Sequence, residues 1–319
     1  MIRMMNGAMK LVEICAGVKR GENVLIVTDT EKVSIAEVLA AAAYAKGAET
    51  AIIIMTPRKM HSEEPPKMVA AAMKNADVIF APTTYSISRT KATVEALKAG
   101  ARMITMPDYT DEMLITGGIE ADFMALKHLA ERISKEYVGE NIKVASPAGT
   151  SLKALIKGRK PNIETGICHK PGDFGPPPDV EVNIPPVEGS AEGLLLVDAA
   201  ASGIGLIKDP IKVTVKGGFI TSIEGKEEAE KLKKILEAAK DPNAYNIAEI
   251  GLGLNPKARL IGRLLEDEGV LGTAHIGVGS SLPLGGKIQA PLHIDLIIRN
   301  PTIEIDGKKI IENGELKIQ

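Results

Sequence analysis

The stretch VLIVTDTEK, residues 24–32, decides the fold class of the first part of the chain. Its four leading apolar residues predict a buried strand, and this strand ends in polar residues. Similar apolar runs follow at 51–55, 78–81 and 102–106, with helical patterns between them. Strands that alternate with helices are typical of an open, mostly parallel sheet. We therefore expect an α/β domain over residues 1–137.

The turn after this first strand argues against a nucleotide site. A bound phosphate needs close approach of the backbone at such a turn, and glycine allows that approach at the lowest cost. The chain instead continues with TDTEK at 28–32, and it contains neither a G-x-G-x-x-G motif nor a P-loop. The sheet is thus expected to serve a purpose other than nucleotide binding.

The composition changes near residue 138. Glycine and proline together number 12 in residues 1–137 and 38 in residues 138–319. Short apolar runs between these residues predict strands, and longer helical patterns appear at 227–239 and 256–266. We expect a β-rich α+β domain over residues 138–319 that follows the α/β domain.

The composition of the whole chain excludes several classes of protein. The 39 basic and 41 acidic side chains leave a net charge of −2, which disfavours a nucleic-acid or anionic-membrane binder. Two cysteines, Cys15 and Cys168, are too few for a disulfide framework or a four-cysteine zinc site. No apolar stretch reaches membrane-spanning length. We expect a cytoplasmic protein, and the scarcity of glutamine beside plentiful lysine and glutamate suits a thermophile.

His293 and Asp295 form the leading candidate for a metal site. They lie in the apolar run 291–298, which predicts a strand, and residues two apart in a strand project from the same face. An imidazole and a carboxylate at one point are suitable ligands for a divalent metal ion. His275 lies in the glycine-rich run 272–279, which predicts a further strand with open backbone beside it.

Two carboxylates extend this candidate site. Glu249 precedes the glycine-rich bend 250–256, and Glu181 alternates with apolar Val180 and Val182. None of these residues has the short fixed spacing of a zinc finger or of H-E-x-x-H. A surface His-x-Asp pair therefore remains the alternative interpretation of positions 293 and 295.

The order of these segments resembles that of a known family. Glu181 is followed by PVEGSAEG at 186–193, AEIGLGLNP at 248–256, GTAH at 272–275 and HID at 293–295. This order resembles that of the thermophilic metallo-aminopeptidases, the aminopeptidase T and aminopeptidase S relatives, through most of residues 138–319. The same scaffold carries ferrous dihydroxypyridine dioxygenases.

The resemblance implies a metal-dependent hydrolase of the leucyl-type aminopeptidase kind, which removes N-terminal residues from peptides by metal-activated water. It implies two divalent ions, zinc, cobalt or manganese, and catalytic roles for two of the carboxylates, Glu181 and Glu249. It also implies a homodimer that binds a peptide or small-molecule substrate. The implied metal ligands are Glu181, Glu249, His275, His293 and Asp295.

Two positions depart from the family pattern. The peptidases have a tyrosine seven residues after the first ligand histidine, where this chain has Leu282. Many relatives have the stretch Ser-x-x-His-Thr near the substrate, where SISRT at 86–90 puts Arg89 in the place of histidine. A permanently charged arginine predicts binding of a substrate carboxylate rather than acid–base chemistry.

These departures leave two alternatives open. The first is a mononuclear ferrous ring-cleaving dioxygenase of the dihydroxypyridine dioxygenase type, because His275, His293 and Asp295 have the composition of a two-histidine, one-carboxylate triad. The second is a non-catalytic relative that retains the scaffold.

Overall fold

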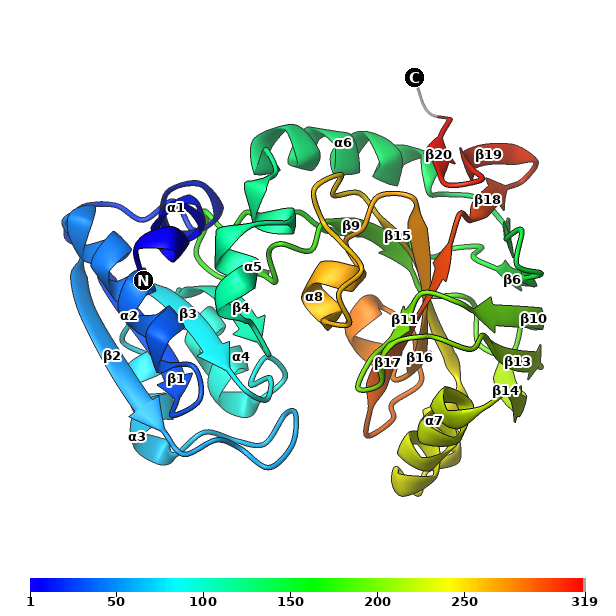
Figure 1. The fold of residues 1–319 in the computed structure, drawn as a ribbon, viewed down its shortest axis with the longest axis horizontal. Coiled ribbons are helices and arrows are strands. Elements are labelled where there is room, and N and C mark those ends of the chain that lie inside the picture. Colours follow the sequence, from blue (N-terminus) through cyan, green and yellow to red (C-terminus); the bar gives the residue numbers. More distant parts are fainter. Residues whose placement is uncertain (318–319) are drawn as a thin grey trace. The chain divides into compact units, whose positions relative to one another are not determined.

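A computed structural model describes residues 1–317, which form two compact units (Figure 1). Unit 1 comprises Met1–Lys127 and Glu164–Pro178, and unit 2 comprises His128–Ile163 and the chain from Asp179 onward. The predicted boundary at residue 137 differs from this division. The chain leaves unit 1 within a helix, and residues 164–178 return to unit 1. Residues 318–319 of the predicted second domain lie outside the described residues.

Unit 1 contains the predicted open parallel sheet. Its strand order is β2-β1-β3-β4-β8, and every pairing in it is parallel. The strands are β1 (Asn23–Asp29), β2 (Glu49–Met55), β3 (Val78–Thr83), β4 (Arg102–Pro107) and β8 (Phe174–Gly175). The last strand, contributed by the returning segment, is too short to leave a pattern in the sequence.

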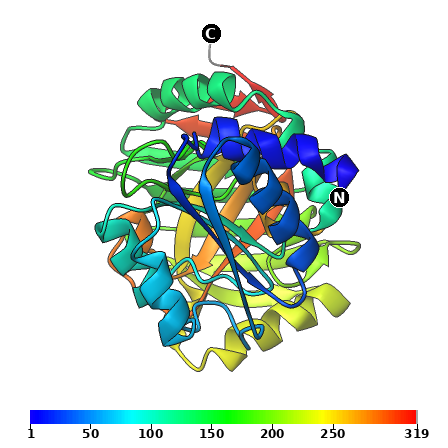
Figure 2. The same cartoon turned by 90° about the vertical axis from the view of Figure 1, so that its left-hand side faces the viewer.

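Helices cover both faces of this sheet, as alternating β and α segments require (Figures 1 and 2). Leu25, Val27 and Ile79 pack with the helices α3 and α4, and α2 packs against β1 and β2. The helices are η1 (Ile2–Met4), α1 (Met5–Lys10), η2 (Leu11–Cys15), α2 (Val33–Ala45), α3 (Lys67–Met73), α4 (Lys91–Lys98), α5 (Asp111–Ile115), η3 (Gly118–Glu120) and α6 (Phe123–Glu136), the last of which leads into unit 2.

Unit 2 is built on two largely antiparallel sheets, so the predicted class, an α/β domain followed by a β-rich domain, is confirmed. The first sheet has the order β14-β13-β10-β6-β5-β18-β19-β20. In β5 and β6, buried residues such as Ile142 and Leu152 alternate with exposed ones. Its strands are β5 (Asn141–Ala145), β6 (Ser151–Leu155), β10 (Glu192–Val197), β13 (Ile211–Lys216), β14 (Phe219–Glu224), β18 (Thr302–Ile305), β19 (Lys308–Glu312) and β20 (Glu315–Leu316).

The second sheet of unit 2 has the order β12-β11-β17-β16-β15-β9-β7. Its strands are β7 (Asn162–Glu164), β9 (Glu181–Ile184), β11 (Ala200–Ala201), β12 (Gly205–Leu206), β15 (Ile247–Gly253), β16 (Thr273–Gly279) and β17 (His293–Arg299). The remaining helices are α7 (Glu227–Ala238), η4 (Pro242–Tyr245), α8 (Leu264–Asp267) and η5 (Leu282–Leu284).

The predicted helix at 256–266 is wrong, because only the short helix α8 forms there. The carboxylate of Asp267 accepts hydrogen bonds from the backbone N–H groups of Ile261 and Gly262, at 2.6 and 3.1 Å. Gly262 has a φ of +79°, which a helix does not permit. The backbone before α8 therefore folds around this carboxylate and not into helical turns.

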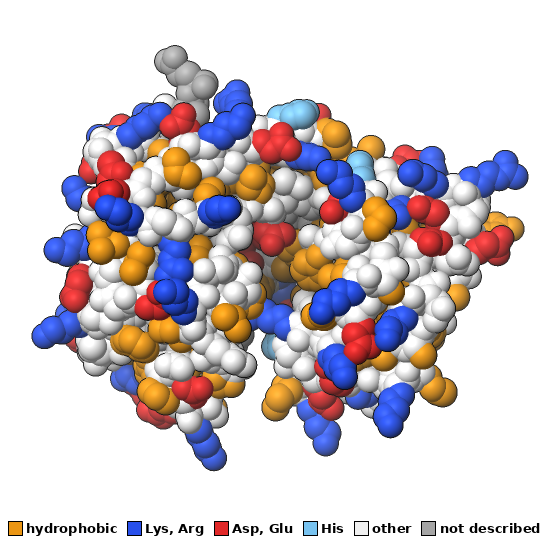
Figure 3. All heavy atoms as spheres, turned by 180° about the vertical axis from the view of Figure 1, so that it is seen from behind, with side chains coloured by type: hydrophobic (Ala, Val, Ile, Leu, Met, Phe, Trp, Pro, Cys, Tyr) orange, Lys and Arg blue, Asp and Glu red, His pale blue; other side chains and the backbone are white. Residues whose placement is uncertain are grey.

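The surface mixes charges of both signs. Basic and acidic side chains are interspersed over both units on the face that Figure 3 displays. This mixture agrees with the small net charge of the chain. Among residues 1–317, no helix is long and apolar enough to cross a membrane.

Candidate metal centre

Four neighbouring strands of the seven-stranded sheet carry the five predicted metal ligands. The strands β9, β15, β16 and β17 lie side by side, and alternate side chains of each project from the same face. The other face carries buried apolar residues, including Ile250, Ile276 and Leu296. The polar face carries Glu181 on β9, Glu249 on β15, His275 on β16, and His293 and Asp295 on β17.

Glycines lie beside these ligands in the register of the sheet. Gly277 pairs with Glu249 on one side and with Asp295 on the other. Gly251 pairs with His275, and a Cβ atom at this glycine would lie 1.8 Å from Nε2 of that imidazole. A Cβ atom at Gly277 would lie 2.6 Å from Cβ of Glu249. The glycine-rich composition of these strands therefore clears the space in which the ligands meet.

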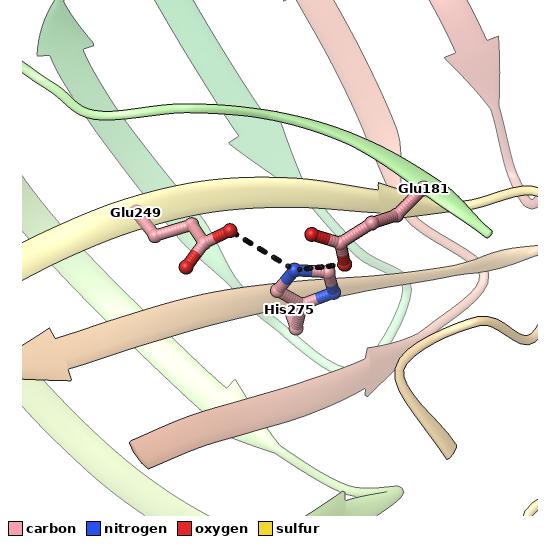
Figure 4. Close-up of side chains that lie close together, drawn as sticks. All are labelled: Glu181, Glu249 and His275. Atoms are coloured by element: carbon pink, nitrogen blue, oxygen red, sulfur yellow. Dashed lines mark ion pairs between the residues drawn. The ribbon is translucent and has the colours of Figure 1, made fainter. Parts of the chain in front are cut away.

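The first group of ligands consists of Glu181, Glu249 and His275. Nε2 of His275 lies 2.9 Å from Oε2 of Glu181 and 3.6 Å from Oε1 of Glu249. Figure 4 shows both carboxylates directed toward the imidazole from neighbouring strands. One ligand atom from each residue lies within 4.8 Å of the others, which is close enough for a single metal ion to contact all three.

The second group consists of Glu249, His293 and Asp295. Nε2 of His293 lies 2.9 Å from Oε2 of Glu249 and 3.4 Å from Oδ1 of Asp295. Their ligand atoms again lie within 4.8 Å of one another. Glu249 thus belongs to both groups, with one carboxylate oxygen toward each histidine.

Ion pairs hold this cluster together in the metal-free protein. Burial alone would lower the pKa of His293, but the Asp295 and Glu249 carboxylates outweigh it and raise the pKa to about 10. Glu181 and Glu249 likewise raise the pKa of His275 well above its ordinary value, against the effect of burial. Burial opposes the ionisation of Asp295, yet the His293 charge holds the pKa of that carboxyl below its usual range. The imidazolium charges occupy the place that a cation would take.

The donor set fits a divalent metal ion. It consists of imidazole nitrogens and carboxylate oxygens, which are ligands of transition metal ions in proteins. Nδ1 of His293 lies 2.8 Å from the carbonyl oxygen of Ser280, so Nδ1 carries the proton and Nε2 faces the carboxylates. A backbone or carboxylate partner of this kind orients metal-binding histidines. Oδ1 of Asp295 is buried and has no hydrogen-bond partner among the described residues.

Further residues contribute to the centre that the strand pattern does not identify. Glu268, which follows α8, hydrogen bonds to Asp295. Burial and the Asp295 charge raise the pKa of Glu268 well above its ordinary value, which favours the neutral carboxyl beside Asp295. Its place in the acidic run 266–268 is the only signal in the sequence, and that run is equally typical of a solvated surface.

Tyr137, just after α6, is a second such residue. Its side chain is fully buried, and its hydroxyl has no hydrogen-bond partner within residues 1–317. Burial raises the pKa of this phenol, and the negative charges of Glu181 and Glu249 raise it further. The phenol is therefore neutral and lies within electrostatic range of the centre.

Arg89 and Leu282 lie outside the cluster of ligands. Arg89 belongs to unit 1, between β3 and α4, and its side chain is exposed. The pKa of His61 is lowered by burial and by the Arg89 charge, which places the two residues near each other. Leu282 begins η5 in unit 2 and is 51% exposed. Because the five ligands belong to unit 2, the role of Arg89 in substrate binding stays a prediction.

Comparison with known proteins identifies relatives over nearly the whole chain. The model of the NicX family, described as 2,5-dihydroxypyridine 5,6-dioxygenase, matches residues 3–318. A 2,5-dihydroxypyridine 5,6-dioxygenase of Pseudomonas putida KT2440 is 28% identical over 261 residues, which cover 77% of this chain and 72% of the relative.

Two solved structures share the fold. A 2,5-dihydroxypyridine dioxygenase from Pseudomonas putida KT2440 superposes with a TM-score of 0.82 at 21% identity, over 99% of this chain and 97% of the other. Wild-type AmpT from Thermus thermophilus superposes with a TM-score of 0.73 at 16% identity, over 99% of both chains. At these identities the likeness establishes the architecture alone.

Proposed function

The chain belongs to the 2,5-dihydroxypyridine 5,6-dioxygenase family, and on that premise we propose that it is a ferrous ring-cleaving dioxygenase acting on a dihydroxylated pyridine or a related aromatic ring. The relative from Pseudomonas putida, which bears the same name, supports this proposal. The proposal concerns both the metal, one ferrous ion per chain, and the class of substrate.

The predicted aminopeptidase activity, and with it the assignment as a hydrolase and metalloprotease, is wrong. The family model spans residues 3–318, and the relative matched in sequence is also a dioxygenase. The likeness to AmpT, at 16% identity, extends to the fold only. Leu282, where the peptidases have tyrosine, already pointed away from peptide hydrolysis, since its side chain can neither donate a hydrogen bond nor bind a metal.

One observation carries the proposal: His293 and Asp295 of β17 project from the same face as His275 of the adjacent strand β16, and Glu249 joins the two ligand groups to which they belong. Two imidazoles and one carboxylate that leave other positions open form the ligand set of non-haem ferrous oxygenases. A bound ferrous ion would supply the one-electron chemistry by which dioxygen reacts with an electron-rich ring.

Glu249 is the residue best placed to accept a proton from a ring hydroxyl, since its two oxygens face both histidines. Burial opposes the ionisation of Glu249, but His275 and His293 outweigh it and lower its pKa, so this carboxylate is ionised and can take up a proton.

The test measures oxygen uptake by metal-free protein reconstituted separately with ferrous iron, zinc and manganese. Substrates would include 2,5-dihydroxypyridine, dihydroxylated aromatic acids and N-terminal peptide amides. We expect oxygen consumption with ferrous iron alone, in a one-to-one ratio to the ring consumed, and none in His293→Ala. Release of free amino acid without oxygen uptake would overturn the proposal.

A further inference from the structure

Two asparagine side chains, one buried and one half-buried, connect Glu181 to a loop by hydrogen bonds. Asn183 lies two residues further along β9, on the same face, and is 1% exposed. Its Nδ2 donates a hydrogen bond to Oε1 of Glu181 at 2.6 Å. That contact leaves Oε2 of Glu181 directed toward His275, at 2.9 Å (Figure 4). Asn183 therefore determines which oxygen of Glu181 faces the centre.

The orientation of the Asn183 amide is itself fixed by a second asparagine. Nδ2 of Asn162, the first residue of the edge strand β7, donates to Oδ1 of Asn183 at 2.9 Å. The same Nδ2 donates to the carbonyl oxygen of Leu284 in η5, at 3.1 Å. Because Asn183 accepts from one side and donates to the other, a reversed amide would lose both bonds.

The far end of this chain of hydrogen bonds is the loop 280–292, which joins β16 to β17. Arg159 donates to the carbonyl oxygen of Gly285 at 3.0 Å, and the backbone N–H of Lys287 donates to Glu188 at 2.7 Å. The first residue of the loop, Ser280, accepts the Nδ1 bond of His293. The loop 280–292 thus contacts Asn162, which acts on Glu181 through Asn183, and it contacts His293 directly.

If Asn183 and Asn162 served only to hold β9 in place, their hydrogen-bonded amide groups would not be required. The opposite face of β9 buries the apolar side chains of Val182 and Ile184, and their packing holds the strand in place. A buried network of amides costs desolvation that only a complete set of hydrogen bonds offsets. The three hydrogen bonds run from the loop through both asparagines to a carboxylate of the centre, which points to a role in orienting that carboxylate.

We propose that Asn183 and Asn162 are positioning residues that orient Glu181 for metal binding and couple the metal centre to the loop 280–292. The inference takes Glu181 as a ligand because it groups with Glu249 and His275, and it rests on the proposed function only in that a metal ion binds at this centre. Coupling of this kind acts in both directions, so metal binding must also hold the loop more firmly.

The first experiment measures zinc affinity of metal-free protein by competition with a chromophoric chelator. Asn183→Ala is expected to weaken zinc binding 10- to 100-fold, the range found for partners that orient metal ligands. In the background of Glu181→Ala, the same substitution is expected to have no further effect. Asn246→Ala serves as the control, since Asn246 is equally buried but donates to the carbonyl oxygen of Gly279. Additive losses in the double variant would overturn the proposal.

The second experiment uses the edge-strand residue, whose substitution leaves the core of the sheet intact. Zinc is expected to slow tryptic cleavage after the exposed Lys287 several-fold in the parent protein. Asn162→Ala is expected to abolish that protection and to weaken zinc binding, whereas Asn162→Gln partly restores both. Equal protection in the parent and in Asn162→Ala would overturn the coupling. Neither experiment depends on oxygen uptake. A protein that consumes no oxygen but gives the expected zinc affinities and cleavage rates would refute the proposed function and not this inference.

Discussion

At the scale of single residues, the metal centre depends on glycines, whose lack of a side chain leaves space beside the ligands. Gly251 lies opposite His275, and no side chain larger than hydrogen fits between them. Gly277 separates Glu249 from Asp295 in the same way. The positions of the ligands therefore follow from the backbone register as much as from the ligands themselves.

This dependence predicts the effect of a single methyl group. Gly251→Ala would place Cβ 1.8 Å from Nε2 of His275, so the imidazole must leave its position. We expect at least a 100-fold loss of zinc affinity while the circular dichroism spectrum stays that of the parent. Gly158→Ala is the matched control: Gly158 has a φ of +76° and nothing near its Cβ position, so stability falls by ~1 kcal/mol and zinc affinity is unchanged.

The protonation of the histidines predicts how metal binding depends on pH. In the metal-free protein the pKa of His293 is raised to about 10, and that of His275 is raised as well. The raised pKa means that each imidazole holds its proton more firmly than an ordinary histidine and must lose it to bind a metal. Zinc affinity is therefore expected to keep rising from pH 6 to pH 9, with about one proton released for each histidine that binds.

Titration calorimetry in buffers of different ionisation enthalpy measures this proton release directly. Imidazoles with an ordinary pKa near 6.5 would give a plateau above pH 7.5 and release few protons at pH 8. That result would contradict the ion-paired state of the metal-free centre.

The candidate site could be predicted in part from the sequence at this scale. Alternation in a strand places His293 and Asp295 on one face, and the resemblance to a known family supplies Glu181, Glu249 and His275. The motif surroundings also made Glu268 a candidate for a supporting residue, whereas Asn162 and Asn183 could not be found in that way. Their contacts arise from the register between strands that are far apart in the sequence, and no local pattern records that register.

At the scale of elements, a buried arginine joins the start of β4 to the chain before β1. The Arg102 guanidinium donates to both oxygens of Glu22, at 3.0 and 2.6 Å, and to the carbonyl oxygen of Ala16 at 2.7 Å. Burial opposes the ionisation of Glu22, but Arg102 and Lys19 outweigh it and lower its pKa. This pair fixes the end of η2 against the sheet of unit 1.

Removal of the Glu22 charge is expected to destabilise the protein. Glu22→Gln leaves the buried Arg102 charge without its carboxylate, and the expected loss is ~2 kcal/mol, below the value for a fully buried pair because the Glu22 side chain is 20% exposed. The lowered pKa of Glu22 stabilises the folded state above the unfolded value near 4.3, and this contribution disappears as the pH falls through the folded pKa.

Urea unfolding of the parent and of Glu22→Gln measures both effects. The two midpoints should differ at pH 7 and converge below pH 4. Glu95→Gln, which removes one partner of the exposed pair with Lys74, is the control and should match the parent at both pH values. A difference between Glu22→Gln and the parent that is as large at pH 3 as at pH 7 would contradict the argument.

The elements of unit 1 follow from the sequence more closely than those of unit 2. Apolar runs such as 51–55 and 102–106 predict the strands, and the helical patterns between them predict that these strands pair in parallel. The pattern at 256–266 misleads, since the Asp267 carboxylate captures the backbone N–H groups that a helix would use. β8 could not be predicted, because its two residues pair with β4 only through the return of 164–178 to unit 1.

At the scale of the whole molecule, the strand β2 leaves an apolar edge free. It is the terminal strand of its sheet, and Ile52 and Ile54 are 37% and 52% exposed. Residues 50–56 carry no charge, and charged side chains commonly protect such an edge from pairing. The predicted homodimer thus has a candidate interface in which two copies of β2 pair antiparallel.

Substitution at that edge tests the dimer. Ile54→Lys is expected to shift the protein from dimer to monomer in light scattering coupled to size-exclusion chromatography, with zinc affinity unchanged. Leu155→Lys, at a similarly exposed apolar position in unit 2, is the control and should leave the molecular mass unaltered. A parent protein that is monomeric at high micromolar concentration would refute the predicted dimer.

The whole-molecule comparison also explains why the sequence suggested the wrong reaction. The fold is shared with AmpT as well as with a dioxygenase, so the scaffold alone does not distinguish hydrolysis from oxygen chemistry. The family match over residues 3–318 supplied that distinction. In the sequence itself, the two reactions differ only at single positions such as Leu282.

The glycines beside the ligands have a practical consequence for anyone who transplants this metal centre into another protein or searches sequences for it. A protein engineer who copied only the five ligands onto another sheet would build a site that the neighbouring side chains close. A search pattern that demands glycine at the positions equivalent to 251 and 277, as well as the ligands, would reject such chains. It would return proteins whose backbone can host a metal, even where a ligand has since been exchanged for another donor.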